Sequence, residues 1–265
     1  MTGLQIVVLA LIQGLTEFLP VSSSAHLILG RWVFSWPDQG LVLDLAVHFG
    51  TLVAVLIYFR NELLDMVRAM LSRGPAPHQV QERRLGWSII LASIPVLLVG
   101  LLAYDFVEHW LRDLRVIALA TLVFGILLWV ADRCFPARRK LAELGLSQAM
   151  MIGLAQVLAL VPGTSRSGIT ITAGRMLGFD ADAAARFSFL LSIPVIAAAG
   201  ADGLLKVWLQ ETAVRWQDFG LAVVVAAVAG WMCIAAFLAL LKRVGLLPFV
   251  IYRLLLAAAL LYIAF

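Results

Sequence analysis

The sequence predicts an all-α polytopic membrane protein with an inverted repeat, in which each half is a re-entrant helix–loop–helix plus three transmembrane helices. Its 265 residues are 63% hydrophobic and only 14% charged, whereas a soluble domain is nearer half apolar and a quarter charged. Six apolar runs approach the ~20 residues that a helix needs to cross a bilayer. Two further apolar regions are interrupted near the middle.

The six continuous runs are each predicted to span the membrane. The interrupted regions, 4–36 and 147–178, are broken at "FLPVSSSAH" and "LVPGTSRSG". Because each half is too short to span, both regions are predicted to be re-entrant hairpins. Such irregular backbone is tolerated at membrane depth only where protein covers it or where it lines a wet cavity. The spanning runs are 41–59, 87–104, 116–131, 183–200, 219–240 and 249–265.

The basic residues orient these helices through the positive-inside rule. They concentrate in 60–86, which is predicted to be a loop, in the loop after Ala131 and in the turn after Leu240, whereas 105–115 and 202–218 contain more acidic than basic residues. The first group is therefore expected in the cytoplasm, which places both termini outside. The net charge of +4 is spread over short loops rather than one solvated face, which argues against nucleic acid as a partner.

An offset of 143 residues aligns the two interrupted regions. It pairs Gln13 with Gln156 and Ser22 with Ser165. The offset divides a single membrane domain, residues 1–265, into repeats of about 1–140 and 141–265. Because each repeat contains three spans, the second must be inverted. Inverted repeats with broken helices place a polar site near the midplane, where the two hairpin tips meet.

The second interruption, "PGTSRSGIT", has the composition of an anion site. Pro162 is predicted to end one half-helix, and the next begins past Gly168, with free N–H groups and its positive dipole end at the turn. Arg166 stands in that turn, and a planar guanidinium suits phosphate oxygens. Ser165, Ser167 and Thr170 offer hydroxyls. The alternative is that Arg166 pairs with an intramembrane carboxylate and that the serines cap helices.

The first interruption supplies complementary groups. Gln13 and Glu17 are spaced i, i+4, so both project from one face of the first half-helix, and Glu17 is an oxygen ligand suited to Mg²⁺ or Ca²⁺. Ser22 and Ser23 follow the break, and His26 can act as nucleophile, general acid or general base. The alternative makes the serines helix caps and His26 a core residue. An acidic tip that faces an arginine tip favours chemistry on a phosphate.

Three stretches, "GLTEFLPVSSSAHLIL", "PGTSRSGITITAG" and "AARFSFLLSIPV", resemble the bacterial undecaprenyl-diphosphate phosphatase family, the bacitracin-resistance type. The likeness covers essentially the whole chain. It implies hydrolysis of the C55 isoprenoid lipid undecaprenyl diphosphate to undecaprenyl phosphate, the carrier lipid of peptidoglycan synthesis. It also implies a divalent cation, Mg²⁺ or Ca²⁺, a place in the bacterial inner membrane among its lipids, and a site open to the periplasm.

The resemblance also assigns roles to residues. It places the family's (E/Q)xxxE metal-binding pair on Gln13 and Glu17. Many members have glutamate where this chain has Gln13, so this chain has one carboxylate fewer. The motif serines fall on Ser22 and Ser23 and the histidine on His26. The phosphate-binding set falls on Ser165, Arg166, Ser167 and Thr170, with Gly168 at the helix start.

Two questions stay open at this point. The attacking group can be His26, a serine or water; His26, or a water that it activates, is favoured because a serine would itself need a base. A lipid flippase or anion transporter could use the same cavity and Arg166, since broken helices in inverted repeats are also a transporter architecture. Phosphate release distinguishes the two. The sequence predicts no oligomeric state.

Overall fold

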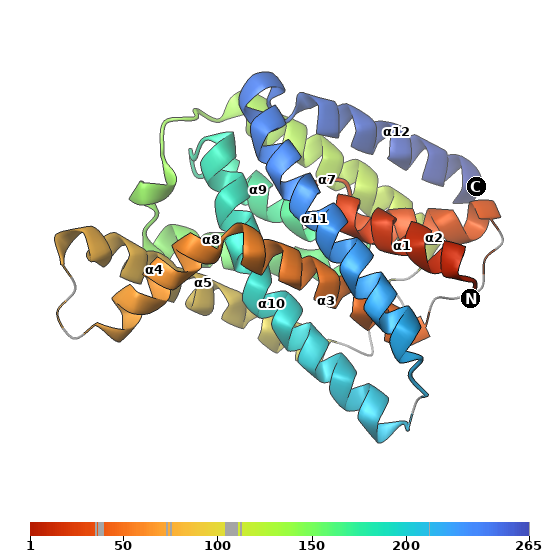
Figure 1. The fold of residues 1–265 in the computed structure, drawn as a ribbon. Coiled ribbons are helices and arrows are strands. Elements are labelled where there is room, and N and C mark those ends of the chain that lie inside the picture. Colours follow the sequence, from red (N-terminus) through yellow and green to blue (C-terminus); the bar gives the residue numbers. More distant parts are fainter. Residues whose placement is uncertain are drawn as a thin grey trace.

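The computed structural model is built from α-helices (Figure 1), and it describes residues 1–34, 36, 40–72, 74, 76–103, 111, 113–211 and 213–264. Within these residues, six helices are long and apolar enough to span a bilayer. Each overlaps one predicted run, which confirms the all-α polytopic class. They are α3 (Gly40–Tyr58), α5 (Pro77–Leu102), α7 (Leu114–Cys134), α10 (Ala181–Leu209), α11 (Trp216–Val244) and α12 (Leu247–Ala264).

Two helix pairs are broken, as the interruptions predict. The first is α1 (Gly3–Thr16) and α2 (Ser23–Phe34); the second is α8 (Leu146–Gln156), with a 3₁₀ turn at Val157–Leu160, and α9 (Arg166–Met176). None of these helices is long enough to span. We call residues 17–24 the first tip and residues 161–168 the second tip; each includes the first residues of the helix that follows.

The boundaries of the second tip differ from the prediction. The helix α8 ends at Gln156, well before Pro162, because the chain tightens into the 3₁₀ turn. The helix α9 begins at Arg166 rather than past Gly168. The cause is Ser165, whose hydroxyl accepts a hydrogen bond from the Gly168 N–H (3.1 Å) and so caps the helix. Arg166 therefore belongs to the first turn of α9.

The basic segment 60–86 was predicted to be a loop, and this is wrong. It contains helix α4 (Arg60–Leu71) and the first turns of α5. Helix α4 buries Met66 and Ala69 and exposes its charged side, so it is amphipathic and too polar to read as a span. It packs against α5 where Gly86 leaves room: a Cβ there would lie 2.5 Å from the Met70 Sδ.

A cluster of aromatic rings anchors the first tip to the core. The Phe189 ring, on α10, lies 5.4 Å from the Phe18 ring and 5.7 Å from the Phe237 ring, centroid to centroid. Phe18 and Phe189 are fully buried. Tilted and edge-to-face pairs of this kind add to the stabilisation from burial. Because Phe18 follows Glu17 directly, this packing fixes the position of the carboxylate.

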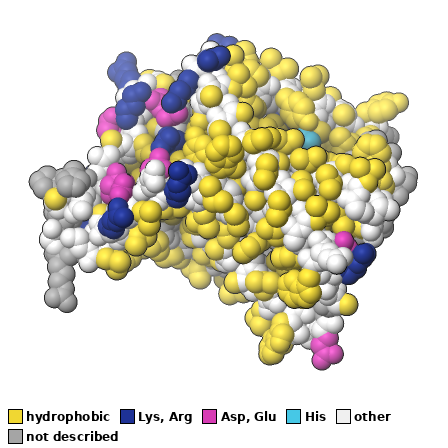
Figure 2. All heavy atoms as spheres, in the orientation of Figure 1, with side chains coloured by type: hydrophobic (Ala, Val, Ile, Leu, Met, Phe, Trp, Pro, Cys, Tyr) yellow, Lys and Arg dark blue, Asp and Glu magenta, His cyan; other side chains and the backbone are white. Residues whose placement is uncertain are grey.

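The surface agrees with a membrane-spanning protein. Figure 2 shows apolar side chains across the middle of one face, with Lys, Arg, Asp and Glu gathered toward its ends. The two chain ends lie on the same side of the molecule in Figure 1. The six spanning helices of the described residues, an even number, agree with the prediction that both ends lie on one side of the bilayer. Parts of the predicted external loop, residues 104–110 and 112, lie outside the described residues.

The two tips have matching backbones. Ser22 and Ser165 both adopt positive φ, 74° and 69°, a region that L-residues other than asparagine and aspartate rarely enter. In each tip, this serine shares a hydrogen bond with the serine two positions later, 3.1 Å in the first and 3.2 Å in the second. These pairs follow the predicted offset of 143 residues; the repeat boundaries themselves stay a prediction.

Candidate active site

The two tips contact each other inside the helix bundle. The Ser167 hydroxyl donates to the Leu19 carbonyl (2.8 Å), and the Gly163 N–H donates to the Ser24 hydroxyl (3.4 Å). Gly163 is required here: its φ is 93°, and a Cβ would lie 2.3 Å from the carbonyl oxygen of Ile117 on α7. Polar groups that lie about 140 residues apart in the sequence are therefore brought into direct contact where the two tips meet.

Glu17 is the centre of this contact. Its Oε2 accepts hydrogen bonds from the Gln13 Nε2 (2.8 Å) and the Ser23 hydroxyl (3.1 Å), and its Oε1 accepts one from the Arg166 Nη2 (3.1 Å). The side chains of Glu17 and Arg166 are only 9% and 12% exposed. A charge buried to this extent costs free energy unless it is paired and hydrogen-bonded. Both conditions are met.

Arg166 joins the second tip to α10. Its Nη1 donates to the Ser188 carbonyl (3.1 Å) while its Nη2 pairs with Glu17. The alternative interpretation expected Arg166 to pair with an intramembrane carboxylate and the serines to cap helices. Arg166 does pair with Glu17, and Ser165 does cap α9. The same geometry also brings a guanidinium and a helix N-terminus beside a carboxylate. A phosphate that enters here meets two preorganised positive groups.

His26 points away from this pair and toward α12. Its Nδ1 lies 2.7 Å from the Ser22 carbonyl and its Nε2 lies 2.6 Å from the Tyr252 hydroxyl. Because a carbonyl only accepts, Nδ1 donates to Ser22 and Nε2 accepts from Tyr252. Among the residues that the structure describes, His26 makes no hydrogen bond with Glu17 or Arg166. Tyr252 was not among the predicted site residues.

The remaining predicted residues divide by exposure. Ser23 and Ser165 are partly exposed, whereas Ser22, Ser167 and Gly168 are buried. Thr170 is 1% exposed. Its hydroxyl lies 2.8 Å from the Arg166 carbonyl, to which it donates, and 2.7 Å from the Ser188 hydroxyl. Thr170 thus holds α9 against α10, beneath the residues that solvent reaches.

Known proteins resemble this chain over nearly its whole length. Residues 6–259 match the model of the bacitracin resistance protein BacA family. The chain belongs to the BacA family. It is 54% identical to an undecaprenyl-diphosphatase of Teredinibacter turnerae over 98% of both chains. Similar proteins of the same name occur in Saccharophagus degradans, 52% identical over 97% and 96% of the two chains, and in Alcanivorax borkumensis, 53% identical over 99% of each.

The oxygen donors of this BacA-family site include one carboxylate and two neutral groups. Among the described residues, no group of three His, Cys, Asp or Glu side chains could hold a metal. The donors present are the Glu17 carboxylate, the Ser23 hydroxyl and the Gln13 Oε1, which is buried and has no hydrogen-bond partner. Mg²⁺ is commonly held by one or two carboxylates and completed by substrate phosphates. The donor set fits such a site.

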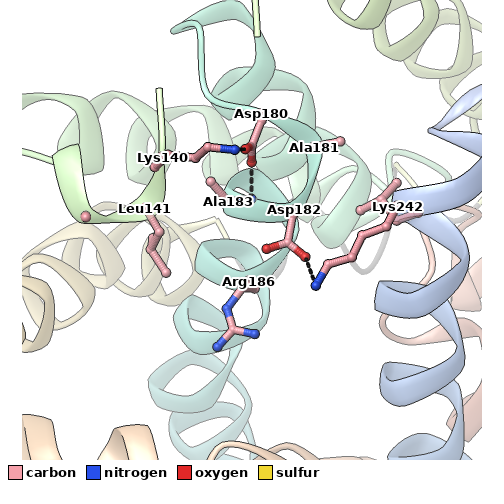
Figure 3. Close-up of a pocket in the computed structure, with 10 residues that line it drawn as sticks. Lys140, Leu141, Asp180, Ala181, Asp182, Ala183, Arg186 and Lys242 are labelled. Carbon is pink, nitrogen blue, oxygen red and sulfur yellow. Dashed lines mark hydrogen bonds and ion pairs between the residues drawn. The ribbon is translucent and has the colours of Figure 1, made fainter. Parts of the chain in front are cut away.

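A cavity of about 650 Å³ lies elsewhere, between α10, α11 and the segment after α7 (Figure 3). Its three cations are already paired: the Lys140 Nζ lies 2.5 Å from Asp180, the Lys242 Nζ lies 3.6 Å from Asp182, and the Arg186 Nη2 lies 2.5 Å from Glu62. Burial alone would raise the pKa of Asp180, but Lys140 and the Ala183 N–H hold that pKa below its usual value. With its charges balanced, this cavity is a poor anion site.

Proposed function

We propose that this protein is an undecaprenyl-diphosphatase, which hydrolyses undecaprenyl diphosphate to undecaprenyl phosphate and inorganic phosphate and thereby confers bacitracin resistance. The observation that carries the proposal is the contact of an acidic and a basic tip, 3.1 Å apart at Glu17 and Arg166, within a bundle of spanning helices. The names of the relatives support it. They do not favour a flippase or anion transporter.

The place of the site explains the choice of substrate. A C55 isoprenoid remains in the bilayer, so only its diphosphate head needs to reach a protein site. The exposed apolar side chains of the spanning helices provide a surface for membrane lipids and for the isoprenoid. Glu17, Ser23, His26, Ser165 and Arg166 are partly exposed, and these are the groups that we expect a head group to contact.

We assign the chemistry as follows. Arg166 and the N-terminus of α9 bind the terminal phosphate and stabilise the charge that builds up as the bridging P–O bond breaks. Ser165, Ser167 and Gly168 shape that turn, and Thr170 holds it from beneath. Ser22 holds His26 through its carbonyl. The attacking group is His26, or a water from which His26 takes a proton, after the Nε2 lone pair is released from Tyr252. Ser23 orients Glu17.

Glu17 and the Gln13 Oε1 would hold the cation, Mg²⁺ or Ca²⁺. When bound, it supplies positive charge to the phosphate oxygens. Gln13 has a second part in this arrangement, because its Nε2 donates to Glu17 and keeps the carboxylate in one orientation. Outer hydrogen bonds of this kind tune metal ligands.

We further propose that the protein lies in the bacterial inner membrane with its site open to the periplasm, the orientation that the distribution of basic residues favours. Cysteines tested one at a time in place of Arg68, Arg139, Asp113 and Glu211, all of them exposed, check this. The background is Cys134→Ser, because Cys134 is exposed and Cys233 is buried. An impermeant external thiol reagent should label positions 113 and 211 only. External labelling at position 68 would overturn the orientation.

The activity is tested by phosphate release from undecaprenyl diphosphate with the purified protein in detergent. We expect steady release of one phosphate per lipid. Movement of the lipid across vesicles without phosphate release would instead support the transporter. The matched control is Arg175→Lys. It changes a buried arginine that lies away from the tips, so it should still release phosphate.

A further inference from the structure

Arg253 on α12 is a buried cation that the proposed chemistry does not use. Its side chain is fully buried, with 0% exposed. Among the described residues, no carboxylate lies within ion-pair distance of its guanidinium, in contrast to Arg166 and Arg175, which pair with Glu17 and Asp132. An ionisable residue at membrane depth is costly and is a candidate for function.

Backbone carbonyls take the place of a carboxylate. The Nε donates to the Thr121 carbonyl on α7 (3.0 Å), and the Nη2 donates to the carbonyls of Gly163 (2.8 Å) and Thr164 in the second tip. The Nη1 donates to the Pro20 carbonyl in the first tip (3.4 Å). One guanidinium therefore joins α12, α7 and both tips. Lysine cannot reproduce this, because it lacks the planar fork.

The chain leaves space for this side chain. A Cβ at Gly125 on α7 would lie 3.3 Å from the Arg253 Cγ and Cδ. A Cβ at Gly168 would lie 2.6 Å from the Arg253 Nη1. Glycine at these two positions lets the arginine run beside α7 (Figure 1 shows α12 along α7) and reach the start of α9.

The carbonyls that Arg253 holds belong to the strained parts of the tips. Thr164 directly precedes Ser165, and Pro20 lies two residues before Ser22; both serines have positive φ. A non-glycine residue stays in this region only when its surroundings fix it there. Arg253 is placed to fix both tips at once.

We propose that Arg253 is a positioning residue for phosphoryl transfer: it holds the two tips in register, so that Glu17 of the first and Arg166 of the second meet one phosphate. This inference rests on the proposed function. Arg253 acts through the tips and does not touch the substrate. Its loss should therefore affect the rate of the chemical step more than substrate binding, because transition-state interactions depend on alignment of the groups.

The test compares Arg253→Lys and Arg253→Met with the control Arg175→Lys. Arg175 is also buried, 4% exposed, but it pairs with Asp132 away from the tips. In folded, monodisperse protein we expect kcat to fall about 10²-fold in both Arg253 variants, as for a misplacement of ~1 Å, with KM within about threefold. Arg175→Lys should lower thermal stability and leave kcat within about twofold. Wild-type kcat in either Arg253 variant would overturn the proposal.

A second pair of variants decides the matter if the Arg253 variants do not fold. Gly125→Ala presses on the arginine stem, whereas Gly220→Ala on α11 adds a Cβ with no atom within 4 Å. We expect kcat to fall roughly fivefold in Gly125→Ala and to stay unchanged in Gly220→Ala. Equal kcat in the two would contradict the proposal. Absence of phosphate release by the wild type would instead refute the proposed function, so the two failures are distinguishable.

Discussion

The two tips share a backbone and differ in charge. Each has a serine at positive φ that is hydrogen-bonded to the serine two residues on. At the offset of 143 residues, however, Leu160 stands where the first tip has Glu17. The glutamines show the consequence: the Gln13 Nε2 donates to Glu17, whereas both polar atoms of the buried Gln156 have no partner. The backbone gives the two tips a common shape, and a few side chains decide which charge each tip holds.

The largest effect should come from removing the charge of the first tip. Glu17→Gln keeps the size of the side chain but loses the carboxylate, so activity should be abolished even at high Mg²⁺ or Ca²⁺. Excess chelator should abolish wild-type activity, and added metal should restore it. Full activity in chelator would show that the reaction does not use a metal.

Gln13→Ala removes one weak ligand and one orienting hydrogen bond, so we expect activity to fall about 10-fold.

The matching change in the second tip is Arg166→Ala. Loss of one preorganised donor at the developing charge typically costs ~10²–10³ in rate, and we expect this fall in kcat rather than only a rise in KM. Arg166→Lys should remain impaired, because it cannot grip two oxygens. Removing one partner of a buried ion pair destabilises by about 3–5 kcal/mol, so thermal unfolding must show that each variant is folded. Near-normal turnover by Arg166→Ala would place the anion site elsewhere.

A smaller effect should follow from Tyr252→Phe. The contact between His26 and Tyr252 has no counterpart in the second half of the chain, because Ile169 stands there in place of a histidine. The variant removes the hydroxyl that donates to the His26 Nε2 and keeps the ring. The Nε2 lone pair must be released from Tyr252 before His26 reacts, and a hydrogen bond contributes about 0.5–1.5 kcal/mol. We therefore expect kcat to rise by roughly 2–10-fold in Tyr252→Phe. A fall in kcat would contradict this and show that the hydroxyl orients the imidazole.

The smallest effect should come from the feature that the tips share. Ser22→Gly and Ser165→Gly relieve a left-handed conformation that costs roughly 1–2 kcal/mol, but each loses a hydrogen bond worth about 1 kcal/mol. Ser165→Gly also weakens the cap of α9 by a few tenths of a kcal/mol. Both should therefore shift the unfolding temperature by less than about 3 °C in detergent. A large loss of stability in one variant alone would show that the tips are not equivalent.

Apolar length and the helix-breaking residues were enough to predict the spans, the broken helices and their polar tips. Helix α4 was missed because its exposed charges conceal the buried side that Met66 and Ala69 form. Tyr252 and Arg253 were missed for another reason: they act through contacts with residues more than 80 positions away. An arginine within an apolar span was a signal that the sequence offered. The partner of Thr170 on α10 could not be predicted, because only tertiary packing brings Ser188 beside it.

The Glu17–Arg166 pair has a consequence for product release. The carboxylate is a tethered competitor for the guanidinium, always present at a high effective concentration. A diphosphate, which brings several negative charges, displaces the carboxylate from the guanidinium. Inorganic phosphate brings fewer charges, and the carboxylate recovers its partner. We therefore expect inhibition by inorganic phosphate only at roughly millimolar concentrations, the scale set by such a tethered group, so that the enzyme keeps working as its own product accumulates.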